Sequence, residues 1–97
     1  HIVMWRYKDG VDGKTALEHS AWMKENLEAL MGVVPELHSL EYGIDVLRTP
    51  SSYDGVLTVT VDDIDALSRY ANHPEHLKIV DYAKRVAESR VAVDFEC

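Results

Sequence analysis

Apolar side chains recur along this chain with two periods, and the order in which these periods alternate leaves few possible topologies. Residues 1–7 are rich in β-branched and aromatic side chains and end at the turn residues 8–10, which predicts a strand. From about residue 14 to 31 the apolar positions recur at helical spacing, which predicts one amphipathic helix that Gly32 and Pro35 terminate. The inner stripe of this helix comprises Ala16, Met23, Leu27, Leu30 and Val34.

The middle of the chain alternates apolar and polar side chains twice. Residues 37–47 alternate around Leu40 and Tyr42, and residues 53–61 do so again after the loop of residues 49–52. Two half-buried segments separated by a short loop predict a hairpin of antiparallel strands.

Two helices and a strand follow the hairpin. Asp62 or Asp63 can cap a short helix, and Pro74 suits the first turn of the next one because its missing N–H needs no partner there. Residues 90–96 predict a closing strand. The short helix carries Ile64, Leu67 and Tyr70 on one side, and the inner stripe of the second comprises His76, Val80, Ala83 and Ala87.

The order β-α-β-β-α-α-β predicts one domain over residues 1–97 with a ferredoxin-like α+β fold, in which helices cover one face of a four-stranded antiparallel sheet. If Val3 and Trp5 face the helices, then Ile2 and Met4 point away from them, together with Val56. An apolar sheet face without cover predicts a homodimer in which two sheets pack into an α/β barrel.

Composition excludes several classes of function. Ten basic against seventeen acidic residues leave a net charge of −7, and the bases are scattered, which disfavours nucleic-acid binding. The longest apolar stretch, residues 29–34, falls far short of the roughly 18 residues of a membrane span. The single cysteine, Cys97, excludes an internal disulfide and a cysteine-based zinc site and fits a reducing compartment, so we expect a cytoplasmic protein.

The residues best suited to catalysis lie between positions 70 and 76. His76 is the third residue of a helix that Pro74 begins, where the helix dipole disfavours imidazolium and keeps the ring neutral, as a general base requires. Tyr70 lies on the inner side of the preceding helix, and its phenol can donate to a developing enolate. We expect these two as a catalytic pair. The alternative is that His76 is bonded to a main-chain group and Tyr70 is core packing.

Four further residues are candidates for substrate contact. Trp5 and Leu67 would form walls of a pocket between sheet and helices, and His1 shares the strand face of Trp5. His73 precedes a proline, which favours extended backbone and a role as a helix cap or packing residue.

The histidines do not predict a metal site. His73-x-x-His76 has the spacing of a metal pair, but the two rings point differently at a helix start and no further ligand is evident. The chain also lacks a phosphate-binding glycine loop and a nucleophilic-serine elbow, so we expect no cofactor. His19 and His38 are expected at the solvated surface.

Several motifs together resemble the stress-responsive A/B barrel (Dabb) domain family over essentially the whole chain. The Tyr-x-x-His-Pro-x-His element is the most specific of them. The motifs are His1-Ile2-Val3, Val34-Pro35 with Leu37, Glu41-Tyr42-Gly43, Tyr53-Asp54, Ala66-Leu67-x-x-Tyr70-x-x-His73-Pro74-x-His76, and Val93-Asp94-Phe95-Glu96.

The resemblance implies a ferredoxin-like domain that dimerises sheet to sheet. A plant polyketide cyclase of this family uses cofactor-free aldol chemistry, and the resemblance puts its catalytic tyrosine and histidine at Tyr70 and His76 and a supporting histidine at His1. A further pocket histidine of that cyclase corresponds to Gly55. The resemblance implies binding of a small apolar or carbonyl-bearing ligand. The alternative function is a non-catalytic, stress-associated dimer or ligand carrier.

Overall fold

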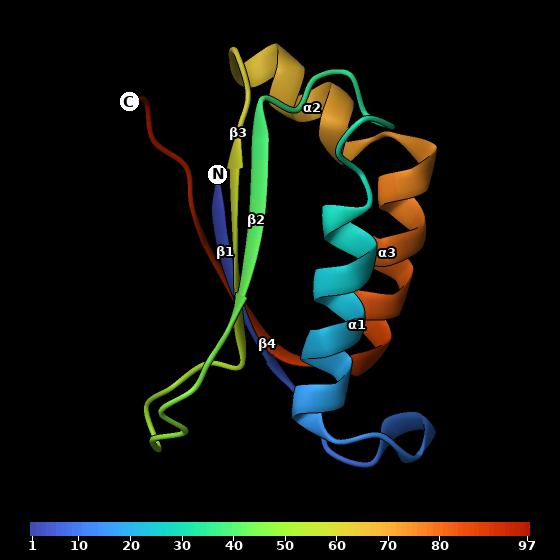
Figure 1. Cartoon of the computed structure of the whole chain (residues 1–97), viewed down its shortest axis with the longest axis vertical. Coiled ribbons are helices and arrows are strands. Elements are labelled where there is room, and N and C mark those ends of the chain that lie inside the picture. The colour runs from blue at the N-terminus through green and yellow to red at the C-terminus, as the bar shows by residue number, and fades with distance from the viewer.

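Helices and strands follow one another in the predicted order in the computed structural model, which covers residues 1–97 (Figure 1). The strands are β1 (Ile2–Tyr7), β2 (Ser39–Ile44), β3 (Gly55–Thr60) and β4 (Ala87–Val93), and the helices are α1 (Ala16–Glu28), α2 (Ile64–Ala71) and α3 (Pro74–Val86). A short 3₁₀ turn, Val11–Gly13, joins β1 to α1. None of the helices combines the length and apolar character needed to span a bilayer.

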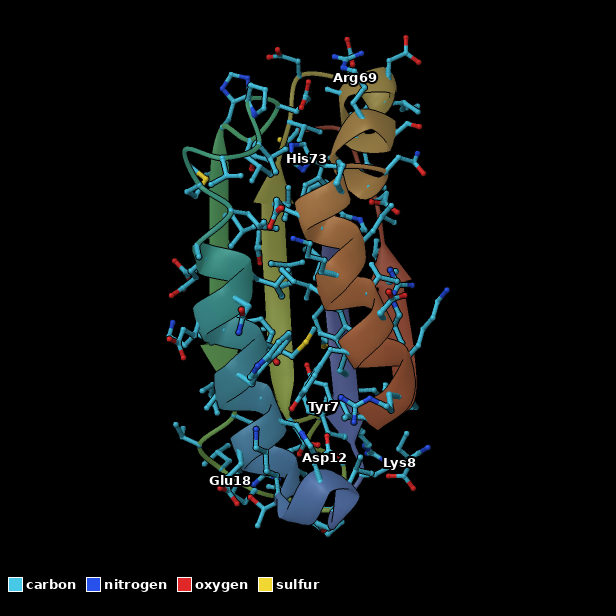
Figure 2. The ribbon with its side chains drawn as sticks, turned by 90° about the vertical axis from the view of Figure 1, so that its right-hand side faces the viewer. Tyr7, Lys8, Asp12, Glu18, Arg69 and His73 are labelled. Carbon is cyan, nitrogen blue, oxygen red and sulfur yellow. The ribbon has the colours of Figure 1, made fainter.

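All four strands form one antiparallel sheet in the order β2-β3-β1-β4, which leaves β2 and β4 at the edges. Figure 2 shows α1 and α3 running side by side across one face of this sheet, with α2 at one end of them. The ferredoxin-like α+β prediction is therefore confirmed.

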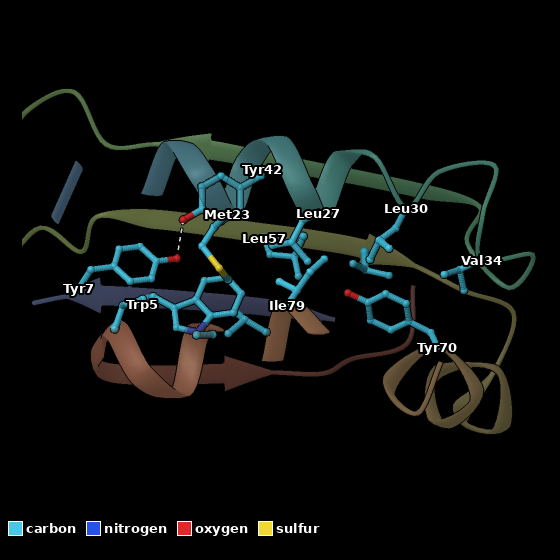
Figure 3. Close-up of a cluster of buried hydrophobic side chains, with 14 of the residues drawn as sticks. Trp5, Tyr7, Met23, Leu27, Leu30, Val34, Tyr42, Leu57, Tyr70 and Ile79 are labelled. Carbon is cyan, nitrogen blue, oxygen red and sulfur yellow. Dashed lines mark hydrogen bonds between the residues drawn. The ribbon is translucent and has the colours of Figure 1, made fainter. Parts of the chain in front are cut away.

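The inner sheet face and the helices enclose the core, part of which Figure 3 shows. Val3, Trp5 and Tyr7 alternate along β1 and are almost fully buried. They meet Met23 of α1 and Ile79 of α3, so the alternation expected of residues 1–7 is confirmed. Burial of large aromatic and aliphatic side chains on both sides of this layer is the main source of stability in such a fold.

A buried polar cluster fastens the β2–β3 end of the sheet to α1. The Tyr42 hydroxyl lies 2.7 Å from the Tyr7 hydroxyl and 2.8 Å from Ser20 Oγ. Asp54 accepts hydrogen bonds from the Tyr7 N–H at 2.8 Å and from Arg48 Nη2 at 2.7 Å. Each hydroxyl of this cluster thus has a partner, as burial of polar groups requires.

Side-chain caps fix where the helices begin. Thr15 and Glu18 form a reciprocal capping box at α1. Asp63 Oδ1 accepts from the Ala66 N–H at 2.7 Å, which makes Asp63 the cap of α2. His73 caps α3, as predicted, with Nδ1 accepting from the Glu75 N–H at 3.1 Å.

Several element boundaries differ from prediction. α1 ends at Glu28 rather than near residue 31, because the chain continues in turns that still bury Leu30 and Val34. β2 ends at Ile44, and Val46 is 87% exposed because the chain leaves the sheet towards the side away from the helices (Figure 1). β4 begins at Ala87 rather than at residue 90, because α3 passes into the strand without a loop.

The expectation for His19 is wrong. His19 is fully buried, and its Nδ1 lies 2.6 Å from the Tyr82 hydroxyl, so it ties α1 to α3. Its position falls three residues after Ala16 and four before Met23, within the buried stripe of α1. Trp22 stacks on Tyr82 with ring centroids 3.7 Å apart. His38 is exposed, as expected, and is paired with Asp62.

The opposite face of the sheet is apolar and has no cover within the chain. Met4 lies between Val56 of β3 and Val91 of β4, and Ile2 lies beside Val93. Of these, Met4, Val91 and Val93 are exposed, although residues of this kind are normally buried. We call these five residues the outer sheet face. It contains the three residues predicted from sequence and extends onto β4.

Candidate functional site

A cavity of about 540 Å³ lies between the inner sheet face and the helices. Its walls come from β1, from α1, from the α2–α3 junction and from the start of β4, and most of them are apolar. Five of the six predicted site residues line it, namely His1, Trp5, Leu67, Tyr70 and His76. The volume suits a small organic ligand.

Tyr70 presents an unpartnered phenol to the interior. Its side chain is 1% exposed, and its hydroxyl makes no hydrogen bond. Figure 3 shows the hydroxyl directed from α2 towards Leu57 and Ile79, both of which line the cavity. Burial raises the pKa of Tyr70 well above its ordinary value, so the group remains a protonated donor at neutral pH.

His76 stands beside Tyr70, with ring centroids 4.4 Å apart. Its Nδ1 lies 2.9 Å from the Ala71 carbonyl oxygen, so Nδ1–H donates and Nε2 is the acceptor of the neutral ring. Burial lowers the pKa of His76, against the opposing effect of this hydrogen bond. A neutral imidazole with a fixed tautomer is the form that a general base requires.

His1 extends the site along β1. Its ring lies 6.4 Å from that of Tyr70 in an edge-on arrangement, and its Nδ1 is 2.5 Å from Asp94 Oδ1. The carboxylate of Asp94 therefore sets the orientation of this ring at the end of the cavity.

Trp5 supplies a second buried donor among the lining residues. Its side chain is 5% exposed and its indole Nε1 has no hydrogen-bond partner. An unpartnered buried N–H or O–H group is costly, and a ligand oxygen would satisfy it. Trp5 and Tyr70 thus give the apolar cavity two groups that can orient a carbonyl. The half-buried Leu67 contributes hydrocarbon wall.

His73 does not line the cavity, which corrects the expectation that it contacts substrate. It lies at the α2–α3 junction, where Figure 2 labels it, and its ring caps α3. The extended backbone before Pro74 directs the ring to the start of that helix.

Sequence reasoning missed three charged residues in the lining, Lys84, Glu88 and Arg90. Arg90 lies opposite Trp5 in the β1–β4 ladder and therefore shares the inner face. The ladder shifts register between Arg6 and Tyr7, and no sequence pattern indicates such a bulge. The structure groups no three histidine, cysteine or acidic side chains as a metal site.

Comparisons with known proteins agree with this architecture. A protein of Streptomyces coelicolor, described as uncharacterised, is 36% identical over 76 residues, which covers 78% of this chain and 76% of that protein. A dimeric protein of unknown function with a ferredoxin-like fold from Bacteroides fragilis matches with a TM-score of 0.80 and 27% identity, over 99% of this chain and 92% of that chain.

Two further solved structures share the fold. A dimeric ferredoxin-like protein from Thermobifida fusca has a TM-score of 0.82 at 24% identity, over 99% of this chain and 87% of that chain. A Dabb family protein with a ferredoxin-like fold from Mesorhizobium loti has a TM-score of 0.75 at 16% identity, over 99% of this chain and 92% of that chain.

The family model of the stress responsive A/B barrel domain matches residues 1–97, the whole of this sequence. Together with the sheet order and the Tyr-x-x-His-Pro-x-His element at the α2–α3 junction, this match shows that the chain belongs to the stress responsive A/B barrel (Dabb) family.

Proposed function

We propose that this protein binds a small apolar ketone in the cavity and that His76 and Tyr70 promote cofactor-free proton transfer next to its carbonyl group. One observation carries the proposal: the imidazole of His76 and the unpartnered, buried phenol of Tyr70 line one cavity, with ring centroids 4.4 Å apart. The atoms that the chemistry needs are free of hydrogen bonds to the protein. For His76 this atom is Nε2, because only Nδ1 is bonded, and for Tyr70 it is the hydroxyl oxygen.

The reaction is an enolisation followed by an aldol addition of the kind that closes polyketides. His76 Nε2 takes a proton from the carbon beside the carbonyl, and the electron pair of that C–H bond becomes the enolate. The Tyr70 hydroxyl donates a hydrogen bond to the enolate oxygen, which the dry surroundings strengthen. In a ligand with a second carbonyl group, the enolate carbon then attacks that carbonyl, and imidazolium gives the proton to the resulting alkoxide. In a ligand with one carbonyl, imidazolium returns the proton to the enolate carbon.

The functional unit in this proposal is a homodimer joined through the outer sheet face. The solved relatives from Bacteroides fragilis and Thermobifida fusca are dimeric, and the exposed Met4, Val91 and Val93 favour burial against a second copy. The cavity lies on the other side of the sheet, so each subunit keeps its own site.

Deuterium exchange at the carbon beside the carbonyl of butyrophenone tests the chemistry, since enolisation is its only requirement. In D₂O at neutral pH we expect catalysed exchange, followed by proton NMR. His76→Ala should lower the exchange rate about 100-fold, the smaller end of the usual general-base effect, and Tyr70→Phe should lower it by a similar factor. His38→Ala is the matched control because His38 is an exposed histidine outside the cavity, and it should exchange like the wild type. Equal rates in the wild type and His76→Ala would refute the proposal.

A non-catalytic ligand carrier is the second candidate, and the hydrogen bond from His76 to Ala71 favours it. That bond joins α3 to the end of α2, which is what a structural histidine would do. A carrier would bind butyrophenone without catalysing exchange, and His76→Asn, which can keep a donor near the Ala71 carbonyl, would bind it equally well. Isothermal calorimetry combined with the exchange assay separates the two functions.

A further inference from the structure

The cavity has a charged rim that the proposed chemistry does not use. The rim consists of Lys84 near the end of α3 and of Glu88 and Arg90 in β4, all exposed residues of the lining. Because these lining residues are exposed, the cavity meets solvent here. Two cations and one carboxylate make the rim net positive in a chain whose total charge is −7.

The sheet register directs Arg90 towards the cavity. Arg90 and Trp5 are directly opposed in the antiparallel β1–β4 ladder, so both side chains project to the inner face. Trp5 is buried in the apolar wall, whereas Arg90 is exposed. The aliphatic stem of an arginine at such a place packs along apolar surface while its guanidinium stays at the edge of water.

The guanidinium of Arg90 has no hydrogen-bond or ion-pair partner within the chain, although Glu88 is only two residues away. Every other arginine has a partner: Arg6 bonds to the Pro50 carbonyl, Arg48 to Asp45 and Asp54, Arg69 to Glu36, and Arg85 to Asp12. A guanidinium is a planar fork that matches a carboxylate in two parallel hydrogen bonds. An unpaired one at the mouth of an apolar cavity suits an incoming carboxylate.

The charge of Arg90 also reaches the two proposed catalytic groups. It opposes the burial that raises the pKa of Tyr70, and it adds to the burial that lowers the pKa of His76, because a nearby cation favours a phenolate and disfavours an imidazolium. The same field favours negative charge on an enolate oxygen beside Tyr70. Arg90 therefore acts in the same direction as the proposed chemistry.

We propose that Arg90 binds a carboxylate at the rim, so that the substrate class is keto acids with an apolar body rather than neutral ketones. The proposal rests on the proposed function, since the cavity must first bind a ketone. Lys84 adds positive charge to the same rim, and Glu88 opposes it, which favours a ligand with a single anionic group.

Two probes isolate the contribution of the carboxylate. Butyrophenone and 3-benzoylpropionate share the aryl ketone and the methylenes beside it. Butyrophenone ends in a methyl group, whereas 3-benzoylpropionate ends in a carboxylate. We expect the wild type to bind 3-benzoylpropionate about tenfold more tightly, a factor that one charge-assisted hydrogen bond at a partly exposed site supplies. Arg90→Leu should abolish this preference, so that the ratio of the two Kd values falls to about one. Lys78→Leu changes the net charge equally on the outer side of α3 and should keep the preference.

The outcomes separate this proposal from the proposed function. If the wild type binds both probes equally, or if Arg90→Leu keeps the preference, the assignment of Arg90 is overturned while ketone binding stands. If neither probe binds to the wild type, the proposed function fails as well. If the wild type prefers 3-benzoylpropionate only at low salt, and Lys78→Leu reduces that preference as much as Arg90→Leu does, the cause is the overall field and Arg90 is not the binding residue.

Discussion

Individual residues of this fold are constrained by how closely their neighbours approach. Gly55 begins β3, and a Cβ atom built there would lie 1.9 Å from the Tyr42 hydroxyl oxygen and 2.6 Å from Ser20 Oγ. Both atoms belong to the buried polar cluster with Tyr7, and Tyr42 is a rigid ring. No larger residue therefore fits at position 55 unless Tyr42 and Ser20 move.

Replacing Gly55 by alanine should lower the free energy of unfolding by at least about 2 kcal/mol, because Tyr42 must be displaced and its hydrogen bonds lost. Gly43→Ala is the matched control: its Cβ would meet only Val56 Cγ1, at 3.4 Å, and we expect a change within about 1 kcal/mol. Urea denaturation measures both. Equal stability of the two variants would contradict the packing argument.

His76 also predicts a pH dependence of stability. Folding lowers the pKa of His76 below its ordinary 6.5, so the unfolded chain binds this proton more tightly than the folded one. The contribution of His76 to the free energy of unfolding is therefore constant at higher pH, and it becomes destabilising as the pH falls through 6.5. Urea denaturation at pH values above and below 6.5 should show a smaller loss of unfolding free energy on acidification for His76→Asn, which cannot titrate, than for the wild type.

NMR titration of the His76 ring measures the same shift directly. The midpoint should lie below 6.5 in the wild type and rise in Arg90→Leu, because the cation that disfavours imidazolium is gone. His38→Asn should leave the His76 midpoint unchanged. A midpoint above 6.5 would mean that burial does not control this group.

Among the secondary-structure elements, α2 is the shortest helix and carries Tyr70. A helix of eight residues is unstable alone, so its cap and the burial of Ala66 and Tyr70 hold it in place. The Asp63 carboxylate satisfies the Ala66 N–H and lies at the positive end of the helix dipole.

Asp63→Ala should cost about 1 kcal/mol of unfolding free energy, the usual value of a lost N-cap, and Asp63→Ser should restore most of it. Asp62→Ala is the control, since Asp62 bonds only to the exposed His38 and caps no helix. Thermal or urea unfolding compares the three variants. A larger loss for Asp62→Ala than for Asp63→Ala would show that the cap is assigned to the wrong aspartate.

The periodicity of the sequence predicted which elements form, because burial on one face dictates where apolar side chains recur. Alternation in β1 and the start of α3 at Pro74 both followed from local chemistry. The start of β4 at Ala87 did not, because pairing with β1 decides where α3 ends.

The candidate site was predictable in part for the same reason. Tyr70 and His76 lie on either side of one short helix break, so local geometry brings them together. The position of Arg90 depends on the register of β4 against β1, which is set by tertiary contacts and a bulge that the sequence does not indicate. The burial of His19 could have been found, since its position lies within the helical stripe.

At the scale of the whole molecule, the outer sheet face predicts the oligomeric state. We expect a dimer at micromolar concentration, because the exposed Met4, Val91 and Val93 favour burial against a second copy. Met4→Lys should shift it to monomer, because each subunit would bury a charge in the centre of the interface. Leu77→Lys is the control, since Leu77 is comparably exposed but belongs to α3 on the other side of the sheet. Sedimentation velocity decides the question, and a monomeric wild type would contradict it.

Successive side chains of β1 point alternately to the two faces of the sheet, and each face has a different role in our proposals. Odd positions such as Trp5 line the cavity beneath the helices, and even positions such as Met4 belong to the outer sheet face that we propose as the dimer interface. Ligand preference and self-association can therefore diverge independently through point substitutions in one six-residue stretch. Inserting a single amino acid before Trp5 would turn the side chains on one side of the insertion to the opposite face of the sheet, which would disturb the cavity and the outer sheet face together.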